Sequence, residues 1–303
     1  MRARLPDRVT IVEVAPRDGL QAERTTIPTE KKLEFIERLV AAGHTVVEAT
    51  SFVSPDAVPQ LADAEALLRS LPRTPGVRYP VLVPNARGLD RALEAGVREV
   101  AVFISASESY SQKNLRRSRS EALDMVSPVV ARAKDAGLRV RGYLSMVVAD
   151  PWDGPTPRHI VVDAGRALLD LGCDELSLGD TIGIGTPADV QRLVGAFVAA
   201  GVPATKLAVH FHDTYGQGLA NVLAALELGV TTVDASAGGI GGSAFARGAA
   251  GNLATEDLIW MLDGLGIETG VRVREVAAAG SWMCERLGRE PAGRVTRALA
   301  AES

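Results

Sequence analysis

Two histidines separated by a single residue, His210 and His212, are the sharpest chemical signal in the sequence. They belong to an apolar, β-rich run, LAVHFHD, at residues 207–213. Side chains two positions apart on a strand point the same way, so both imidazoles would face one site and could bind one metal ion. Histidine is also a versatile hydrogen-bonding group, so two histidines bonded among polar core groups remain an open alternative.

Asp18 and Asn252 are positioned to supply oxygen ligands from the ends of neighbouring strands. Two imidazoles, one carboxylate and one amide suit Mn²⁺, Mg²⁺ or Zn²⁺, and a two-histidine, one-carboxylate iron site is formally open. Each residue also has a structural interpretation. Asp18 precedes Gly19, as in many turns, and Asn252 precedes the helical run LATEDLIWMLDGLG, where asparagine is a favoured N-cap.

Charged residues occur in other β-rich runs as well. Glu48 stands within TVVEATS, and because a lone buried carboxylate is costly it needs a partner, for which Arg17 is a candidate. Asp180 ends the run ELSLGDT, so it occupies a similar strand-end position. The glycine-rich segment GGIGGSAFARGAAGN is either a flexible connection or a lid over a substrate.

The elements that must position these residues form a repeat, in which a helical pattern ends at a glycine and an apolar run follows. Glycine suits the left-handed conformation just past a helix end. With VTIVEVA at residues 9–15, the repeat predicts about eight strands alternating with helices, and hence a parallel sheet. An open doubly wound sheet also alternates in this way, but about eight units in roughly 260 residues favour a closed barrel, and no GxGxxG turn follows the first strand. The glycines are Gly43, Gly76, Gly96, Gly137, Gly172, Gly201 and Gly229.

We therefore predict an α/β fold, a (β/α)8 TIM barrel over about residues 8–265. In such barrels the active site lies at the carboxyl ends of the strands, where the polar residues named above fall. The repeat stops after about residue 265, and VREVAAAGSWMCERLG predicts an added helix. Because no Pro/Ser-rich linker intervenes, we expect one domain over residues 1–303, with a helical tail at about 266–303.

Composition excludes several classes of function. A net charge of -4 and an aromatic content of 4% argue against a nucleic-acid partner. No apolar run approaches the roughly 20 residues of a membrane span. Two cysteines, Cys173 and Cys284, make no disulfide framework, and the first residues have no apolar signal-peptide core. We expect a cytoplasmic protein.

Five segments follow one another along the chain: IVEVAPRDGLQAE, TSFVSPDAVPQ, SLGDTIGIGTP, HFHDTYGQGLAN and GNLATEDL. Together they resemble the hydroxymethylglutaryl-CoA lyase family, which belongs to a group of metal-dependent lyases and aldolases built on TIM barrels. The resemblance runs from about residue 8 to 290. It implies a retro-Claisen cleavage of 3-hydroxy-3-methylglutaryl-CoA into acetyl-CoA and acetoacetate, a step of leucine degradation, by a homodimeric enzyme that binds an acyl-CoA substrate.

The resemblance also implies roles for single residues. A divalent cation, Mg²⁺ or Mn²⁺, would be held by the residues that match the family's ligands, and Arg17 would contact substrate and stabilise the enolate oxygen. Glu48 and Asp180 would line the same site. The matching ligands are Asp18, His210, His212 and Asn252.

At one position the chain departs from the family. The lyases carry a catalytic cysteine in the glycine-rich loop, whereas this chain has Ser243, whose hydroxyl is far less acidic than a thiol. Three interpretations stay open: a lyase that works with Ser243, a lyase or aldolase for a related 3-hydroxyacyl-CoA or hydroxy acid, and a non-catalytic paralogue that binds metal or a CoA ester. The synthase branch of the group, including isopropylmalate synthase, is a fourth, although the APRDGLQ and GNLATEDL contexts favour the lyases.

Overall fold

Eight parallel strands form one sheet in the computed structural model, which describes residues 5–242 and 251–302. Neighbouring strands follow the order β1-β10-β9-β8-β5-β4-β3-β2. The two ends of the sheet meet, because the backbone N–H of Glu13 donates to Val46 (3.0 Å) and that of Glu48 donates to Glu13 (2.9 Å). The predicted TIM barrel is confirmed. The strands are β1 (Thr10–Glu13), β2 (Thr50–Ser51), β3 (Val81–Leu82), β4 (Glu99–Ser105), β5 (Arg139–Ser145), β8 (Glu175–Asp180), β9 (Leu207–Phe211) and β10 (Thr232–Ala235).

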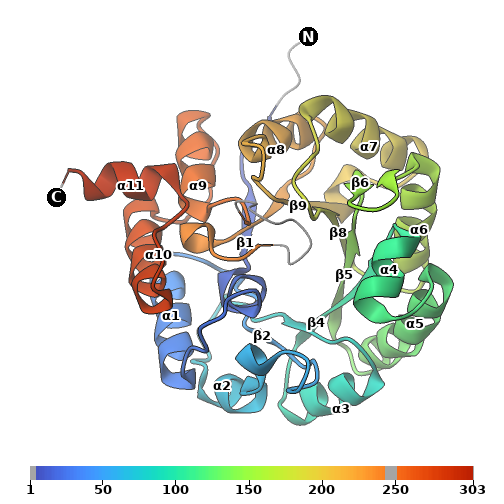
Figure 1. Cartoon of the computed structure of the whole chain (residues 1–303), viewed down its shortest axis with the longest axis horizontal. Helices are drawn as coiled ribbons and strands as arrows, with labels where there is room; N and C mark the ends of the chain where they lie inside the picture. Colours follow the sequence, from blue (N-terminus) through green and yellow to red (C-terminus); the bar gives the residue numbers. More distant parts are fainter. Residues whose placement is uncertain (1–4, 243–250, 303) are drawn as a thin grey trace.

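Helices surround the strands in a ring (Figure 1), and all of them except the last three, which follow β10, lie between one strand and the next along the chain. A short antiparallel pair, β6 (Ala149–Asp150) and β7 (Gly154–Pro155), follows β5. The single-turn segments are η1 (Ala15–Gly19), η2 (Pro59–Leu61), η3 (Ala204–Lys206) and η4 (Ala237–Gly239). The helices are α1 (Thr29–Ala41), α2 (Ala64–Ser70), α3 (Ala86–Glu94), α4 (Glu108–Leu115), α5 (Arg119–Asp135), α6 (Arg158–Asp170), α7 (Pro187–Ala199), α8 (Gly218–Leu226), α9 (Thr255–Gly264), α10 (Val273–Leu287) and α11 (Arg294–Ala300).

All seven glycines that the repeat placed before strands have positive φ. At Gly43, where φ is 111°, a Cβ would also lie 2.2 Å from the carbonyl oxygen of Gly270. Conformation and space both require glycine there, so this residue fixes how the turn after α1 meets the segment before α10.

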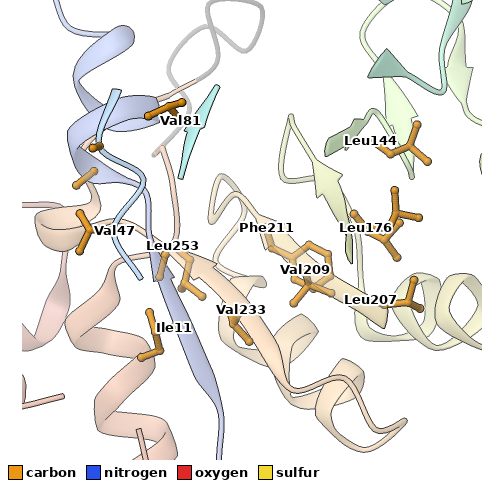
Figure 2. Close-up of a cluster of buried hydrophobic side chains, with 14 of the residues drawn as sticks. Ile11, Val47, Val81, Leu144, Leu176, Leu207, Val209, Phe211, Val233 and Leu253 are labelled. Atoms are coloured by element: carbon orange, nitrogen blue, oxygen red, sulfur yellow. The ribbon is translucent and has the colours of Figure 1, made fainter. Parts of the chain in front are cut away.

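The apolar core lies between the strands and the surrounding helices. Figure 2 shows part of it, where Ile11, Val209 and Val233 come from three adjacent strands. Because side chains alternate along a strand, the residues next to these in sequence point into the barrel, where several buried side chains are polar or charged. The barrel interior is therefore mixed: small apolar clusters, such as Val12, Val14 and Val46, lie beside buried charged side chains such as Arg141 and Asp234.

The last two helices pack beside the barrel, α10 against α1, α9 and η4, and α11 against α9 and α10 (Figure 1). The carboxylate of Asp257 accepts the backbone N–H groups of Arg294 (3.0 Å) and Val295 (2.7 Å) at the start of α11. Glu256 accepts both the hydroxyl of Thr296 (2.5 Å) and the backbone N–H of Gly238 (3.0 Å). The start of α9 thus ties the C-terminal helices to η4. Across residues 5–242 and 251–302, no helix has the length and apolar character that a membrane crossing requires.

Candidate active site

Asp18, His210 and His212 form a group that can hold a metal ion, with one possible ligand atom from each lying within 4.8 Å of the others. Asp18 follows β1 in η1, His210 lies in β9, and His212 comes just after β9. The Oδ2 atom of Asp18 is 3.9 Å from Nε2 of His210. The structure therefore brings together the histidine pair and the carboxylate that the sequence pattern singled out.

The two histidines present nitrogens that suit a cation. Nδ1 of His210 lies 3.2 Å from Oδ2 of Asp234, which leaves Nε2 to face Asp18. His212 is buried, and its Nδ1 has no hydrogen-bond partner in the described part of the chain. A buried nitrogen without a partner is costly, and a bound ion would satisfy the group. Three hard or borderline donors around one point fit a divalent cation.

Asn252 lies beside this group but does not cap the following helix, so that structural alternative is wrong. The N-cap of α9 is Ala254, whereas Asn252 pairs with His212 in an antiparallel bridge. Its Nδ2 donates to Oδ2 of Asp18 (2.8 Å) and to the carbonyl of Ile240 (3.2 Å). Because the amide nitrogen faces Asp18, ligation through the amide oxygen requires the amide to turn over.

Arg17 is the partner of Glu48, as the burial argument predicted. Its Nε and Nη2 both lie 2.7 Å from Oε2 of Glu48, and its Nη1 donates to Oδ1 of Asp18 at 2.7 Å. Burial by itself would lower the pKa of Arg17, but the charges of Glu48 and Asp18 outweigh it and raise that pKa above its ordinary value. A permanent positive charge therefore stands directly beside the candidate metal ligands.

Asp18 is held in its charged form. Burial alone would raise its pKa, but Arg17, His210 and the amide of Asn252 together lower the pKa of Asp18 to about 2. At neutral pH the Asp18 carboxylate can therefore accept hydrogen bonds or bind a cation, but it has no proton to donate as a general acid.

Asp180 is fully buried, and its carboxylate binds the loop that follows β8. Its Oδ2 accepts the N–H of Gly185 (2.7 Å) and its Oδ1 accepts that of Ile184 (3.3 Å). Among the described residues its carboxylate makes no hydrogen bond or ion pair to Arg17 or Glu48. Asp180 therefore shapes the rim of the site, and its role toward substrate stays a prediction.

Ser243, the predicted replacement for the family's cysteine, lies outside the described residues. Both cysteines of the chain lie elsewhere and are buried. Burial raises the pKa of Cys173 and of Cys284 to about 12, so neither is a thiolate at neutral pH. Neither can take over the missing thiol's proton exchange.

Sequence reasoning missed a polar network beneath the metal ligands. Asp234 accepts from Nη2 of Arg141 (2.6 Å) and from the hydroxyl of Ser177 (2.9 Å), and Nε of Arg141 lies 2.9 Å from Glu175. Arg141 and Asp234 are both almost fully buried. The available signals were charges inside apolar strands: Arg141 in RVRGYLS and Asp234 in TTVDAS.

Tyr143 joins this network to the site. It accepts a hydrogen bond from Nη1 of Arg141 (3.1 Å), and its ring meets that of His210 edge-on at 6.1 Å between centroids. The guanidinium of Arg17 lies 5.4 Å from the centroid of the same ring. Burial, and then the nearby Glu48, raise the pKa of Tyr143 well above its ordinary value, so the phenol keeps its proton.

Known proteins resemble this chain along nearly its whole length. The sequence model of the HMGL-like family matches residues 8–282. The mitochondrial hydroxymethylglutaryl-CoA lyase of Bos taurus is 48% identical over 293 residues, which are 97% of this chain and 90% of the relative. The cytoplasmic 3-hydroxy-3-methylglutaryl-CoA lyase of Danio rerio is 50% identical over 295 residues, 97% of this chain and 88% of the relative.

Solved structures of similar proteins share the fold. A hydroxymethylglutaryl-CoA lyase from Pseudomonas aeruginosa superposes with a TM-score of 0.96 at 45% identity, covering 99% of both chains. An HMG-CoA lyase from Acenitobacter baumannii, in complex with coenzyme A and 3-methylmalate, gives a TM-score of 0.91 at 34% identity and covers 96% of this chain and 95% of its own. The similar sequences and the similar structures therefore carry the name of the same enzyme.

Proposed function

Because the chain belongs to the HMGL-like family, we propose that it is a carbon–carbon lyase that cleaves 3-hydroxy-3-methylglutaryl-CoA to acetyl-CoA and acetoacetate by a retro-Claisen reaction. The observation that carries this proposal is the group of Asp18, His210 and His212 directly beside the buried Arg17. Both relatives compared by sequence are lyases for this thioester, which favours this function over a synthase or a non-catalytic paralogue.

The family is metal-dependent, and the candidate ligands fit a divalent cation, for which Mg²⁺ or Mn²⁺ is the finer proposal. Asp18, His210 and His212 would hold it, with Asn252 as the fourth ligand. A cation bound there supplies a Lewis acid that polarises substrate oxygens and favours loss of the hydroxyl proton.

Arg17 supplies a positive charge that can stabilise the enolate from which acetyl-CoA forms. Cleavage of the C2–C3 bond sends an electron pair toward the thioester, where an enolate oxygen develops negative charge. A fixed guanidinium costs no reorganisation as that charge appears, and such preorganised groups are typically worth a few kcal/mol in the barrier. Glu48 holds Nε and Nη2 of Arg17, and the ring of Tyr143 lies over it, so the guanidinium has little freedom to turn away.

Other properties remain proposals. The complex of the Acenitobacter baumannii relative with coenzyme A supports an acyl-CoA as the small-molecule substrate. We propose a homodimer in the cytoplasm; the relatives bear both mitochondrial and cytoplasmic names.

The test is product analysis. The protein is stripped of metal, reloaded with Mg²⁺ or Mn²⁺, and incubated with a panel of 3-hydroxyacyl-CoA thioesters, and the products are measured by mass spectrometry. We expect acetyl-CoA and acetoacetate in equal amounts from 3-hydroxy-3-methylglutaryl-CoA. The His210→Ala/His212→Ala double variant is the control and should lose bound metal by elemental analysis while the barrel stays folded. Intact thioester in the presence of bound metal, with cleavage of a different panel member, would overturn the proposed substrate.

A further inference from the structure

A pocket lies at the opposite end of the barrel from the candidate metal ligands. Its volume is about 640 Å³, within the range of small-molecule sites. Glu99 and Arg139, which line it, are the first residues of β4 and β5, whereas Asp18 and His212 follow the last residues of β1 and β9. Since all eight strands are parallel, these two sets lie at opposite ends of the barrel.

The pocket is strongly basic in a chain whose net charge is -4. Glu99 is the one carboxylate among the residues that line it. Glu99 lies 2.6 Å from Nη1 of Arg78 and 3.3 Å from Nε of Arg139, so two of the arginines are paired. The arginines that line the pocket are Arg69, Arg73, Arg78, Arg98 and Arg139.

The other three guanidinium groups, of Arg69, Arg73 and Arg98, have no carboxylate partner among residues 5–242 and 251–302. They come from the end of α2, the segment after it, and the residue before β4. Like charges gathered from three separate segments repel one another. The nearby carboxylates offset this repulsion only in part, since Glu65, which acts on Arg69, pairs with Arg91, and Glu99 pairs with Arg78 and Arg139. A ligand with two or more negative charges would offset it, and phosphate groups match the geometry of guanidinium donors.

One wall of the pocket is apolar. Leu71, Val77 and Tyr79 line it and are only half-buried, although Leu71 and Tyr79 also pack against the core. A flat, weakly polar ring placed against Tyr79 would cover this wall. The unpaired arginines and the apolar wall together fit a ligand that has negative charges at one end and a flat ring at the other.

We propose that this pocket binds a nucleoside carrying two or more phosphate charges, with its phosphates on Arg69, Arg73 and Arg98 and its base against Leu71, Val77 and Tyr79. The same chemistry could come from a free nucleoside diphosphate or from the phosphorylated nucleotide end of coenzyme A. The site is separate from the reaction centre and does not depend on the proposed lyase activity. A ligand bound in this pocket does not touch the reaction centre, so it could change turnover only by a conformational effect transmitted along the strands.

Isothermal titration calorimetry with 5′-ADP, 3′,5′-ADP and inorganic phosphate tests the proposal. The Arg73→Gln/Arg98→Gln variant removes two unpaired charges from the pocket. The Arg132→Gln/Arg192→Gln variant is the matched control, since these two exposed arginines pair with Asp90 and Asp189 outside the pocket. We expect the pocket variant to bind nucleotide at least about tenfold more weakly, and the control to bind as the wild type does.

The outcomes separate the possibilities. Stronger binding of 3′,5′-ADP than of 5′-ADP, lost in the pocket variant, identifies the coenzyme A nucleotide as the ligand, and the reverse order identifies a free nucleotide. Nucleotide binding that is equal in the wild type and the pocket variant would place the nucleotide in the substrate site and overturn the proposal. Inorganic phosphate bound as tightly as either nucleotide would also overturn it. Turnover measured without added nucleotide should remain at the wild-type level in both variants, because neither pair of arginines touches the metal ligands or Arg17.

Discussion

Asp234 makes a sharp test of the site, because one buried carboxylate contacts both a structural arginine, Arg141, and a candidate metal ligand, His210. It accepts from Arg141 at 2.6 Å, and its other oxygen lies 3.2 Å from Nδ1 of His210. The Asp234→Asn substitution keeps the size of the side chain and removes its charge. We therefore expect two separable effects, one on folding and one on metal binding.

The magnitudes follow from the surroundings. Removing one partner of a buried ion pair typically costs about 3–5 kcal/mol of unfolding free energy. Arg141 keeps Glu175, which lies 2.9 Å from its Nε, so we expect about 3 kcal/mol. Loss of the carboxylate that orients a ligating histidine typically lowers metal affinity by about 10–100-fold.

Glu175→Gln is the matched control. It removes a carboxylate from the same arginine but leaves the contact between Asp234 and His210 in place. Urea unfolding of the metal-free proteins gives the first effect, and titration of the metal-free proteins with Mn²⁺ gives the second. We expect both variants to be destabilised and only Asp234→Asn to lose metal affinity.

The reasoning fails if Asp234→Asn binds Mn²⁺ as tightly as the wild type while it is destabilised. That result would mean that Asp234 serves only the structure of the barrel interior, through Arg141 and Ser177. Equal losses of affinity in both variants would refute it too, because the effect would then come from general loosening of the barrel interior.

Three further predictions concern other residues. Arg17→Met should lower kcat far more than it weakens metal binding, because its charge acts mainly in the transition state; steady-state kinetics beside metal titration would show this, and an unchanged kcat would refute it. Ser243→Cys should raise turnover of 3-hydroxy-3-methylglutaryl-CoA by about tenfold, a part of the 10²–10⁴-fold typical of general acid–base catalysis, and no gain at saturating metal would mean that proton donation is not limiting. Burial raises the pKa of Glu13 from 4.5 to about 7, so its carboxyl keeps a proton that the unfolded chain releases. That contribution is complete below pH 4.5 and is lost as the pH rises through about 7, so Glu13→Gln should flatten the fall in unfolding free energy between pH 5 and 8 by about 3 kcal/mol; a slope like that of the wild type in urea unfolding would contradict this.

The periodic features of the chain were predictable because they are local. Each glycine after a helix marks a left-handed turn that only a few residues determine, and the apolar runs match strands β4, β5, β8 and β9 closely. The run TVVEATS was harder: only Thr50–Ser51 form regular strand, and the rest closes the barrel through isolated bridges to Glu13 and Arg78. How a strand pairs across a closing seam depends on residues far apart in sequence.

The site was predictable where chemistry and spacing coincide. His210 and His212 share a face because they are two residues apart, and Glu48 requires a counter-charge wherever it is buried. The interpretation of Asn252 as a helix cap failed because capping is decided by backbone geometry at Ala254, two residues later. The ion pair between Asp234 and Arg141 was not predicted, because the two residues are 93 positions apart and no local sequence pattern indicates such a contact.

The hydrogen bond between Asp18 and Asn252 joins positions 234 residues apart, one following β1 and the other following its neighbour in the sheet, β10. During synthesis Asp18 and its neighbour Arg17 leave the ribosome early, whereas the other groups around Asp18, those of His210, His212 and Asn252, are made only after most of the chain. A chain stalled or truncated before residue 252 therefore has the first carboxylate but not the full set of donors. We therefore expect the chain to bind its cation only at the end of folding, after the N-terminal and C-terminal parts of the barrel have come together.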